Sequence, residues 1–334
     1  MNIESHYWAN HTEALKQELK EMLPVDELRR LHQRRAGLHF LVMLRQFVLL
    51  GVCSWVLWNV RTPWVWIPVA LVQGWTIFNF SILLHEVLHD LVFQKRRPGW
   101  KRLLGLLYAF PSGMSATQFT TWHLDHHAEL GSSTEDPKRF HLSPKVNKRW
   151  IKLLYFTPAL FPIYFRAARR ETATYPPEVQ RQIAWQRTPT IVAHLLILAA
   201  LCWVGGFYPA ARVYIIPYFF VFPIAFAINR LGQHYDVDPS DPAQWGTLVA
   251  GHWFWDFAYL WSNYHLEHHY FPGVPFYNLP RLQRLLQPFY ARHGMRPRGY
   301  AQLIYGYLVA NNAPHTRWED VAAHHASNEK IADV

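Results

Sequence analysis

Nine histidines in this sequence have spacings that suit metal binding. Two lie four residues apart in HEVLHD, three form HLDHH, three form HLEHH, and one lies alone in GQHYD. An α-helix turns about 100° per residue, so side chains at i, i+3 and i+4 share a face about 100° wide. Each group can therefore direct its imidazoles at one point. The nine residues are His85, His89, His123, His126, His127, His234, His265, His268 and His269.

The size of this set predicts two metal ions. A zinc site uses three or four protein ligands, so nine imidazoles imply two ions. Imidazole also suits iron, copper and nickel, and the spacing therefore leaves the element open. The chain holds 20 histidines, and we expect those outside the set to be ordinary core or surface residues. They include His6, His11, His32, His194, His252, His324 and His325.

The composition indicates a membrane protein with a large water-exposed portion. Hydrophobic residues make up 51% of the chain and aromatic residues 16%, yet 17% of residues are charged. A helix needs roughly 20 apolar residues to cross a hydrocarbon core. Four stretches approach that length: His39–Val60, Trp64–Leu84, Thr190–Tyr208 and Val213–Ile228. Two shorter stretches, Leu103–Met114 and Trp150–Ala167, contain prolines and flanking basic residues, so we expect interfacial helices there rather than a fifth span.

The positions of the charged residues predict an orientation. Arg61 and Arg212 lie in the short connections between spans, and Arg45 lies inside the first span. All other members of the 33 Lys and Arg, with all 23 Asp and Glu, fall on the opposite side of these spans. The positive-inside rule then predicts that both termini and all nine histidines face the cytoplasm.

The expected fold is an all-α membrane protein with four transmembrane helices in two hairpins and a cytoplasmic helical cap that holds a di-metal site. Asp26 is the expected N-cap of a helix through Arg35. The expected segments are a cytoplasmic helical segment (1–38), a transmembrane hairpin with the first histidine group (39–93), cytoplasmic and interfacial helices with the second group (94–189), a second hairpin ending at His234 (190–234), a cytoplasmic cap with the third group (235–312) and a polar tail (313–334).

The lengths of two spans predict a common depth for two of the histidines. His85 follows Trp64 by 21 residues, and His234 follows Val213 by 21 residues. At about 1.5 Å per residue, each helix rises about 32 Å, which is one hydrocarbon thickness. Both histidines should therefore lie just outside the cytoplasmic leaflet, where the other two groups can meet them.

The three groups resemble the signature of the integral-membrane fatty acid desaturase superfamily. The stretch NYHLEHHYFPGVPFYNLPRL is similar to its acyl-lipid desaturase branch, and the resemblance covers roughly residues 39–290. It implies that the nine histidines bind two iron ions and that O2 is a co-substrate. Asn229 resembles an asparagine that contacts the metals through water in some members. Here it precedes His234 by five residues, one more than in the acyl-CoA branch.

The resemblance also implies partners. The substrate would be a fatty acyl chain, either free or linked to a lipid, coenzyme A or a carrier protein. The sequence has neither an HPGG haem motif nor a glycine-rich nucleotide fingerprint, so electrons would come from a separate donor such as ferredoxin or cytochrome b5 with a reductase. The excess of basic residues suits anionic membrane lipids, or an acidic ferredoxin or carrier protein, better than nucleic acid.

Carboxylates and aromatic residues near the histidine groups have candidate supporting roles. The carboxylates are Glu86, Asp90, Asp125, Asp136, Asp256 and Glu267. Of these, Asp90, Asp125 and Glu267 are the expected hydrogen-bond partners of the imidazoles; ordinary solvated charges are the alternative. Trp122, Tyr264, Trp255 and Phe271 could line an acyl tunnel, although anchoring at the membrane interface explains such residues equally well.

A dinuclear iron site predicts oxidation of an unactivated alkyl chain, which side chains alone cannot perform. Desaturation is the expected outcome. Hydroxylation, acetylenic desaturation, carotenoid oxygenation and decarboxylation to a terminal alkene use the same kind of site and stay open. A metal-binding membrane receptor is an alternative from another class. It predicts ionisable residues at the bilayer midplane, where this sequence offers only Arg45.

Overall fold

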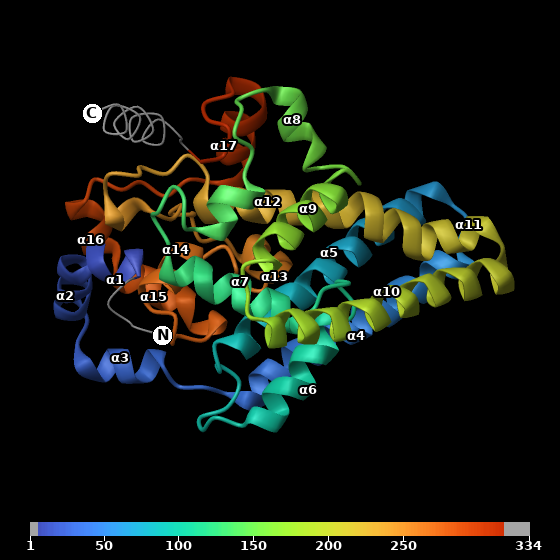
Figure 1. Ribbon diagram of the computed structural model, residues 1–334, viewed down its shortest axis with the longest axis horizontal. Coiled ribbons are helices and arrows are strands. Elements are labelled where there is room, and N and C mark those ends of the chain that lie inside the picture. Colours follow the sequence, from blue (N-terminus) through green and yellow to red (C-terminus); the bar gives the residue numbers. More distant parts are fainter. Residues whose placement is uncertain (1–5, 317–334) are drawn as a thin grey trace.

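The computed structural model describes residues 6–316, and within that range the chain is helical without a β-strand. An isolated bridge joins Val249 and Arg298. Long helices extend to one side of the molecule, and short helices gather at the other side (Figure 1). The expected tail falls mostly outside the described residues, together with His324 and His325.

Four helical stretches of the described chain are long and apolar enough to cross a membrane, as predicted. The long helices are α4 (Ala36–Asn59), α5 (Pro63–Leu88), α10 (Pro177–Gly205) and the continuous run α11 (Phe207–Ala210), η3 (Ala211–Val221) and α12 (Phe222–His234). Each extends past its predicted apolar stretch at one end or both, and α10 does so by the most residues. Helix α10 starts at Pro177, because proline suits a first helical position and the polar residues after it keep helical geometry.

The outer surfaces of these helices are apolar, as a lipid environment requires. In α10, Leu195, Leu196 and Trp203 are exposed, the last of them by 91%. Water would not support so large an apolar surface on a monomer. Helix α5 differs, because most of its apolar window is buried among its neighbours. It is therefore the central helix of the membrane half.

Close packing of α5 depends on a glycine. A Cβ atom built at Gly74 would lie 2.4 Å from Cβ of Val221 and 2.7 Å from the carbonyl oxygen of Pro217. Glycine therefore allows α5 to approach η3, a π-helical stretch that contains Pro217. This contact sets the separation of the two helices that carry His85 and His234 in their last turns.

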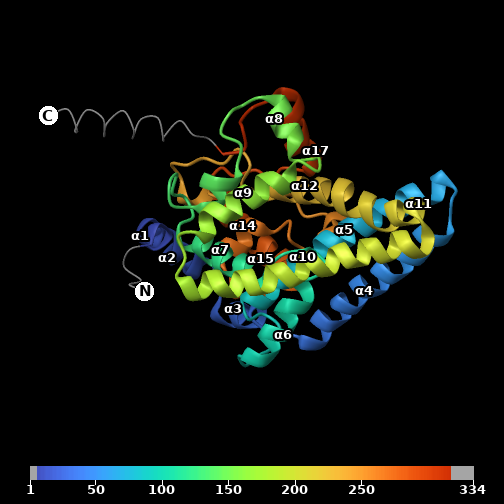
Figure 2. The same ribbon diagram turned by 45° about the vertical axis from the view of Figure 1, so that its right-hand side comes forward.

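The other half consists of short helices that surround the ends of α5 and α12 (Figure 2). They are α1 (Tyr7–His11), α2 (Glu13–Met22), α3 (Val25–Leu31), α6 (Pro98–Ala109), α7 (Ala116–Ala128), η2 (Lys138–Leu142), α8 (Arg149–Leu154), α9 (Leu160–Thr172), η4 (Pro242–Gln244), α13 (Trp253–Ala258), α14 (His265–Tyr270), η5 (Phe276–Asn278), α15 (Leu279–Leu285), α16 (Gln287–Arg292), α17 (Tyr300–Ile304) and η6 (Tyr305–Ala310).

The predicted N-cap at Asp26 is wrong by two residues. Pro24 occupies the N-cap position of α3, and Asp26 lies in the first turn, where its charge favours the helix N-terminus. The helix ends at Leu31 rather than Arg35. The two predicted interfacial stretches overlap α6, α8 and α9, and none of these helices is among the four membrane-crossing candidates.

Candidate metal centre

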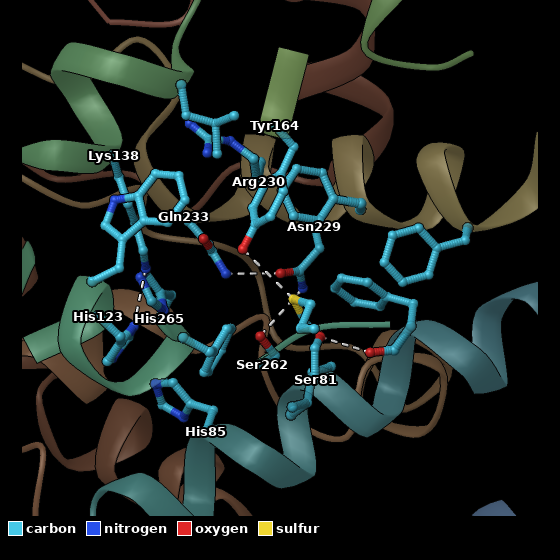
Figure 3. A pocket seen from close by; sticks show the side chains of 18 residues that line it. Ser81, His85, His123, Lys138, Tyr164, Asn229, Arg230, Gln233, Ser262 and His265 are labelled. Atoms are coloured by element: carbon cyan, nitrogen blue, oxygen red, sulfur yellow. Dashed lines mark hydrogen bonds between the residues drawn. The ribbon is translucent and has the colours of Figure 1, made fainter. Parts of the chain in front are cut away.

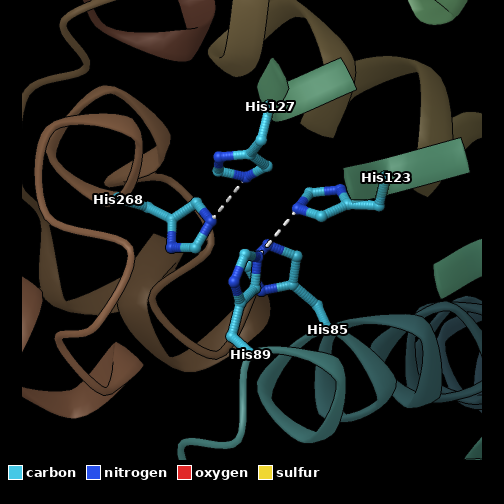
Figure 4. A group of neighbouring side chains, drawn as sticks. All are labelled: His85, His89, His123, His127 and His268. Carbon is cyan, nitrogen blue, oxygen red and sulfur yellow. Dashed lines mark hydrogen bonds between the residues drawn. The ribbon is translucent and has the colours of Figure 1, made fainter. Parts of the chain in front are cut away.

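The nine predicted histidines converge into two adjacent groups. The ring nitrogens within each group lie within 4.8 Å of one another. The larger group, shown in Figure 4, contains His85, His89, His123, His127 and His268. The smaller group contains His126, His234, His265 and His269.

Helix geometry explains how each HxxHH motif serves both groups. In α7, His123 and His127 are four residues apart and enter the larger group, whereas His126 enters the smaller one. In α14 the i, i+4 pair His265 and His269 enters the smaller group, and His268 enters the larger one. The i+3 side chain points to one side of the i, i+4 pair, so each short helix lies between two sites.

His234, the isolated histidine, is fully part of the smaller group. Its Nε2 lies 3.0 Å from Nε2 of His126 and 3.1 Å from Nε2 of His265. The residue count along the spans predicted that His234 would reach the other histidines. It did not predict that His85 would belong to the other group, because a residue count gives the depth in the membrane and not the lateral position.

The rings in both groups are buried or half-buried, and their pKa values suit metal binding. Burial lowers the pKa of His89 to about 3. Burial, together with neighbouring imidazoles or Lys138, also lowers the pKa of His123, His268 and His269 well below 6.5. Metal ligation requires neutral imidazole, so these rings are already in the required form at pH 7.

An unpaired ring nitrogen supports the same interpretation. Nε2 of His85 is buried and has no hydrogen-bond partner within the described structure. Buried polar atoms are rarely left unpaired, because the loss of hydration costs about 1–3 kcal/mol. His85 lies among the other four rings of its group, where a metal ion would satisfy this atom. Nine neutral, inward-facing imidazoles in groups of five and four fit two metal ions.

Two hydrogen bonds to Nδ1 atoms orient rings of the smaller group. Nδ1 of His126 lies 2.8 Å from a carboxylate oxygen of Asp136, and Nδ1 of His234 lies 2.8 Å from the carbonyl oxygen of Trp245. Donation from Nδ1 leaves Nε2 with its lone pair facing the group. Asp136 was one of six carboxylates noted from the sequence and was not preferred among them. It follows His126 by ten residues and lies outside α7, so no helical spacing in the sequence indicates that the two side chains meet.

The three carboxylates that the sequence favoured for this role have other neighbours. Asp90 pairs with Lys101 at 3.0 Å. Asp125 interacts with Tyr175, and burial raises its pKa. Glu267 accepts hydrogen bonds from Tyr290 at 2.6 Å and from Gln283 at 2.8 Å.

The two remaining carboxylates, Glu86 and Asp256, differ in whether they lie beside the histidines. A carboxylate oxygen of Glu86 is 3.8 Å from Nδ1 of His85, and Glu86 accepts the backbone N–H of Phe276. Asp256 instead accepts from Asn263 and Tyr264. Only Glu86 of these two is therefore beside the centre.

A mainly apolar cavity of about 810 Å³, including its open mouth, reaches the histidines. Figure 3 shows His85, His123 and His265 at its wall. Its other lining residues are Phe78, Ser81, Ile82, Met114, Phe119, Trp122, Lys138, Leu142, Tyr164, Phe222, Phe226, Asn229, Arg230, Gln233 and Ser262.

The cavity contains some of the residues singled out from the sequence. Trp122 lines it, whereas Tyr264, Trp255 and Phe271 are not among its lining residues. Asn229 also lines it, donating to Ser262 at 3.2 Å and accepting from Gln233 at 2.8 Å. Asn229 thus presents a polar amide network to the space beside the histidines.

The fold and site define a helical membrane protein with a buried histidine centre suited to metal, open to an apolar cavity. The fatty acid desaturase family model matches residues 61–301, and the chain belongs to this family of oxidoreductases. It is 24% identical over 322 residues to the human sphingolipid delta(4)-desaturase/C4-monooxygenase DES2, covering 92% of this chain and 91% of that protein. It is 26% identical over 239 residues to the sphingolipid delta(4)-desaturase DES1 of Drosophila melanogaster, covering 68% of each.

Proposed function

We propose that the protein is an O2-dependent di-iron desaturase that forms a double bond in a fatty acyl chain. The observation that carries this proposal is the junction of an apolar cavity with the histidine centre. His85, His123 and His265 belong to both. A chain lying in the cavity therefore reaches the histidines directly.

The expected reaction balances as follows. Two hydrogens leave adjacent carbons, and two electrons and two protons arrive from outside. O2 is reduced to two molecules of water, and a double bond replaces the single bond. The two irons supply the oxidising power that amino-acid side chains lack. The nine histidines hold them, and the aromatic walls exclude bulk water from the reacting carbons.

Hydroxylation is the second candidate, because a relative's printed name carries both activities. The human relative is called a delta(4)-desaturase and a C4-monooxygenase. Both reactions begin with removal of one hydrogen, so the same centre serves both. The outcome depends on whether a second hydrogen or an oxygen atom is transferred next, which product analysis distinguishes.

We further propose that the histidine centre lies on the cytoplasmic side of the membrane. The two connections at the far ends of the long helices contain few charges, and Arg61 and Arg212 lie in or beside them. An external donor would then deliver electrons to the basic cytoplasmic face. If turnover with such a donor were insensitive to salt, charge would not guide its docking.

The test combines metal analysis with product analysis. Protein purified with iron should hold two irons per chain and should consume O2 only with an acyl chain and a reductase system. Mass spectrometry after incubation with saturated chains should find products lighter by two hydrogens. A product heavier by one oxygen would favour hydroxylation. A hydrocarbon one carbon shorter than its acid would replace desaturation by decarboxylation.

A further inference from the structure

Two basic side chains line the mainly apolar cavity beside the histidines. They are Arg230, on α12, and Lys138, the first residue of η2. The same cavity is lined by Phe78, Phe119, Trp122, Phe222 and Phe226. An unactivated alkyl chain offers nothing for a cation to bind, so the walls suit the chain while these two residues suit another part of the ligand.

One carboxylate of the described chain, that of Asp136, acts electrostatically on both basic side chains, but it forms a close ion pair with neither of them. Within residues 6–316, no ion pair closer than 4 Å joins a carboxylate to the guanidinium of Arg230 or to Nζ of Lys138. Arg230 donates to the hydroxyl of Ser143 at 3.0 Å, and Nζ of Lys138 lies 3.0 Å from Nδ1 of His123. Asp136, which lines a smaller neighbouring cavity with both cations, already accepts from His126. A partly buried guanidinium and a neighbouring ammonium group that share one carboxylate carry excess positive charge, which a bound anion would balance.

The cations also lie close to the metal-binding rings. Lys138 contacts Nδ1 of His123, and Nε2 of the same ring faces His89 at 3.0 Å. One imidazole ring therefore separates Lys138 from the interior of the larger group. In Figure 3, Lys138 and Gln233 lie on the same side as His123 and His265, with Arg230 above them. An anion held here would be the part of the ligand nearest the centre.

We propose that the cavity binds its acyl chain as a free acid, with the carboxylate held by Arg230 and Lys138 and the chain against the aromatic walls. Guanidinium groups bind carboxylates through paired, charge-assisted hydrogen bonds. The expected position of oxidation rests on the proposed function. With the carboxylate beside the histidines, the oxidised carbons lie near the carboxyl end of the chain and not in its middle.

The first experiment measures binding and needs no turnover. Protein in nanodiscs is loaded with radiolabelled hexadecanoic acid at pH 7, and unlabelled hexadecanoic acid, methyl hexadecanoate or hexadecanol competes for the site. We expect the ester and the alcohol to compete at least about tenfold more weakly than the acid. Arg230→Gln should remove this preference, whereas Arg230→Lys should keep most of it.

The matched control is Arg181→Gln, which neutralises an arginine whose side chain is 76% exposed. Its preference should equal that of the wild type. Comparison of acid-to-ester ratios between proteins cancels differences in how the compounds partition into lipid. Equal competition by acid and ester in the wild type would overturn the proposal, as would an unchanged acid preference in Arg230→Gln.

The second experiment separates this inference from the proposed function. Wild-type products from hexadecanoic acid should be modified within the first few carbons from the carboxyl end. Loss of the carboxyl carbon itself is a modification at this end. Modification at mid-chain would overturn the carboxylate position. If no compound is oxidised but the acid preference and its loss in Arg230→Gln hold, the carboxylate site stands and the oxidase proposal fails.

Discussion

The carboxylate of Asp136 and the ring of His126 form a buried pair, with Oδ1 2.8 Å from Nδ1. The same oxygen accepts the backbone N–H of Lys138 at 2.9 Å, so the turn before η2 fixes the carboxylate. The carboxylate in turn fixes the ring, whose Nε2 points at His234. The loop after α7 is therefore part of the metal centre, although it contributes no ligand.

Replacement of Asp136 by asparagine should weaken the centre without unfolding the protein. Asparagine keeps the shape and an oxygen acceptor but loses the negative charge that makes His126 a stronger ligand. Partners of metal-bound histidines are typically worth 10–100-fold in affinity or activity. We expect a loss in this range for iron retention during dialysis against a chelator. Glu135→Gln, the same change at an exposed neighbour, is the control, and equal iron loss in both variants would contradict the role of Asp136.

Removal of His234 should empty the smaller group and spare the larger one. His234→Gln leaves that group with three imidazoles, whereas the other five ligands are untouched. We expect iron per chain to fall from two towards one, and turnover to fall at least about tenfold, since both ions are needed. Elemental analysis measures this. His252→Gln, at an exposed histidine outside both groups, should retain two irons; two irons and full turnover in His234→Gln would exclude it as a ligand.

The membrane-crossing helices and the histidines that cluster could be predicted from the sequence because both are local patterns. Each of these patterns lies within a single helix: an apolar stretch long enough to cross a bilayer, or an HxxHH motif. The extra length of α10 was missed because its first turns are polar, and the helix continues there without an apolar signal.

The division of the nine histidines could not be predicted, because it depends on how α7 and α14 approach each other. A side chain such as His126 has a definite angle on its own helix, but the sequence does not state which helix lies opposite. Asp136 and the cation pair of the cavity share this limitation. Arg230 precedes His234 by four residues and would face similarly on α12, yet nothing local brings Lys138 beside it.

The buried carboxyl of Glu171 should make stability depend on pH. Burial, with nearby Asp125 and Asp136, raises its pKa to about 7 from 4.5. The folded state therefore binds this proton more tightly than the unfolded state. The resulting stability is fully present below pH 4.5 and is lost as pH rises through 7. Thermal unfolding in detergent should show a smaller drop in Tm between pH 5 and 8 for Glu171→Gln than for wild type. Glu178→Gln, whose side chain is 74% exposed, should follow the wild type; an unchanged slope in Glu171→Gln would contradict this pKa.

Enlargement of Gly74 should disturb the membrane packing and the metal centre together. In Gly74→Ala the new methyl group would lie 2.4 Å from Val221 and 2.7 Å from a backbone oxygen of Pro217, so α5 and η3 must move apart. Overpacking of this kind costs about 1–3 kcal/mol. Helix α5 ends near His85 of the larger group, and η3 leads through α12 to His234 of the smaller group, so both groups should lose iron along with Tm. Gly51→Ala makes the same change on α4, where nothing lies within 4 Å of the new atom, and it should leave both measurements unchanged. A stable Gly74→Ala protein with two irons would show that the separation of these helices does not control the centre.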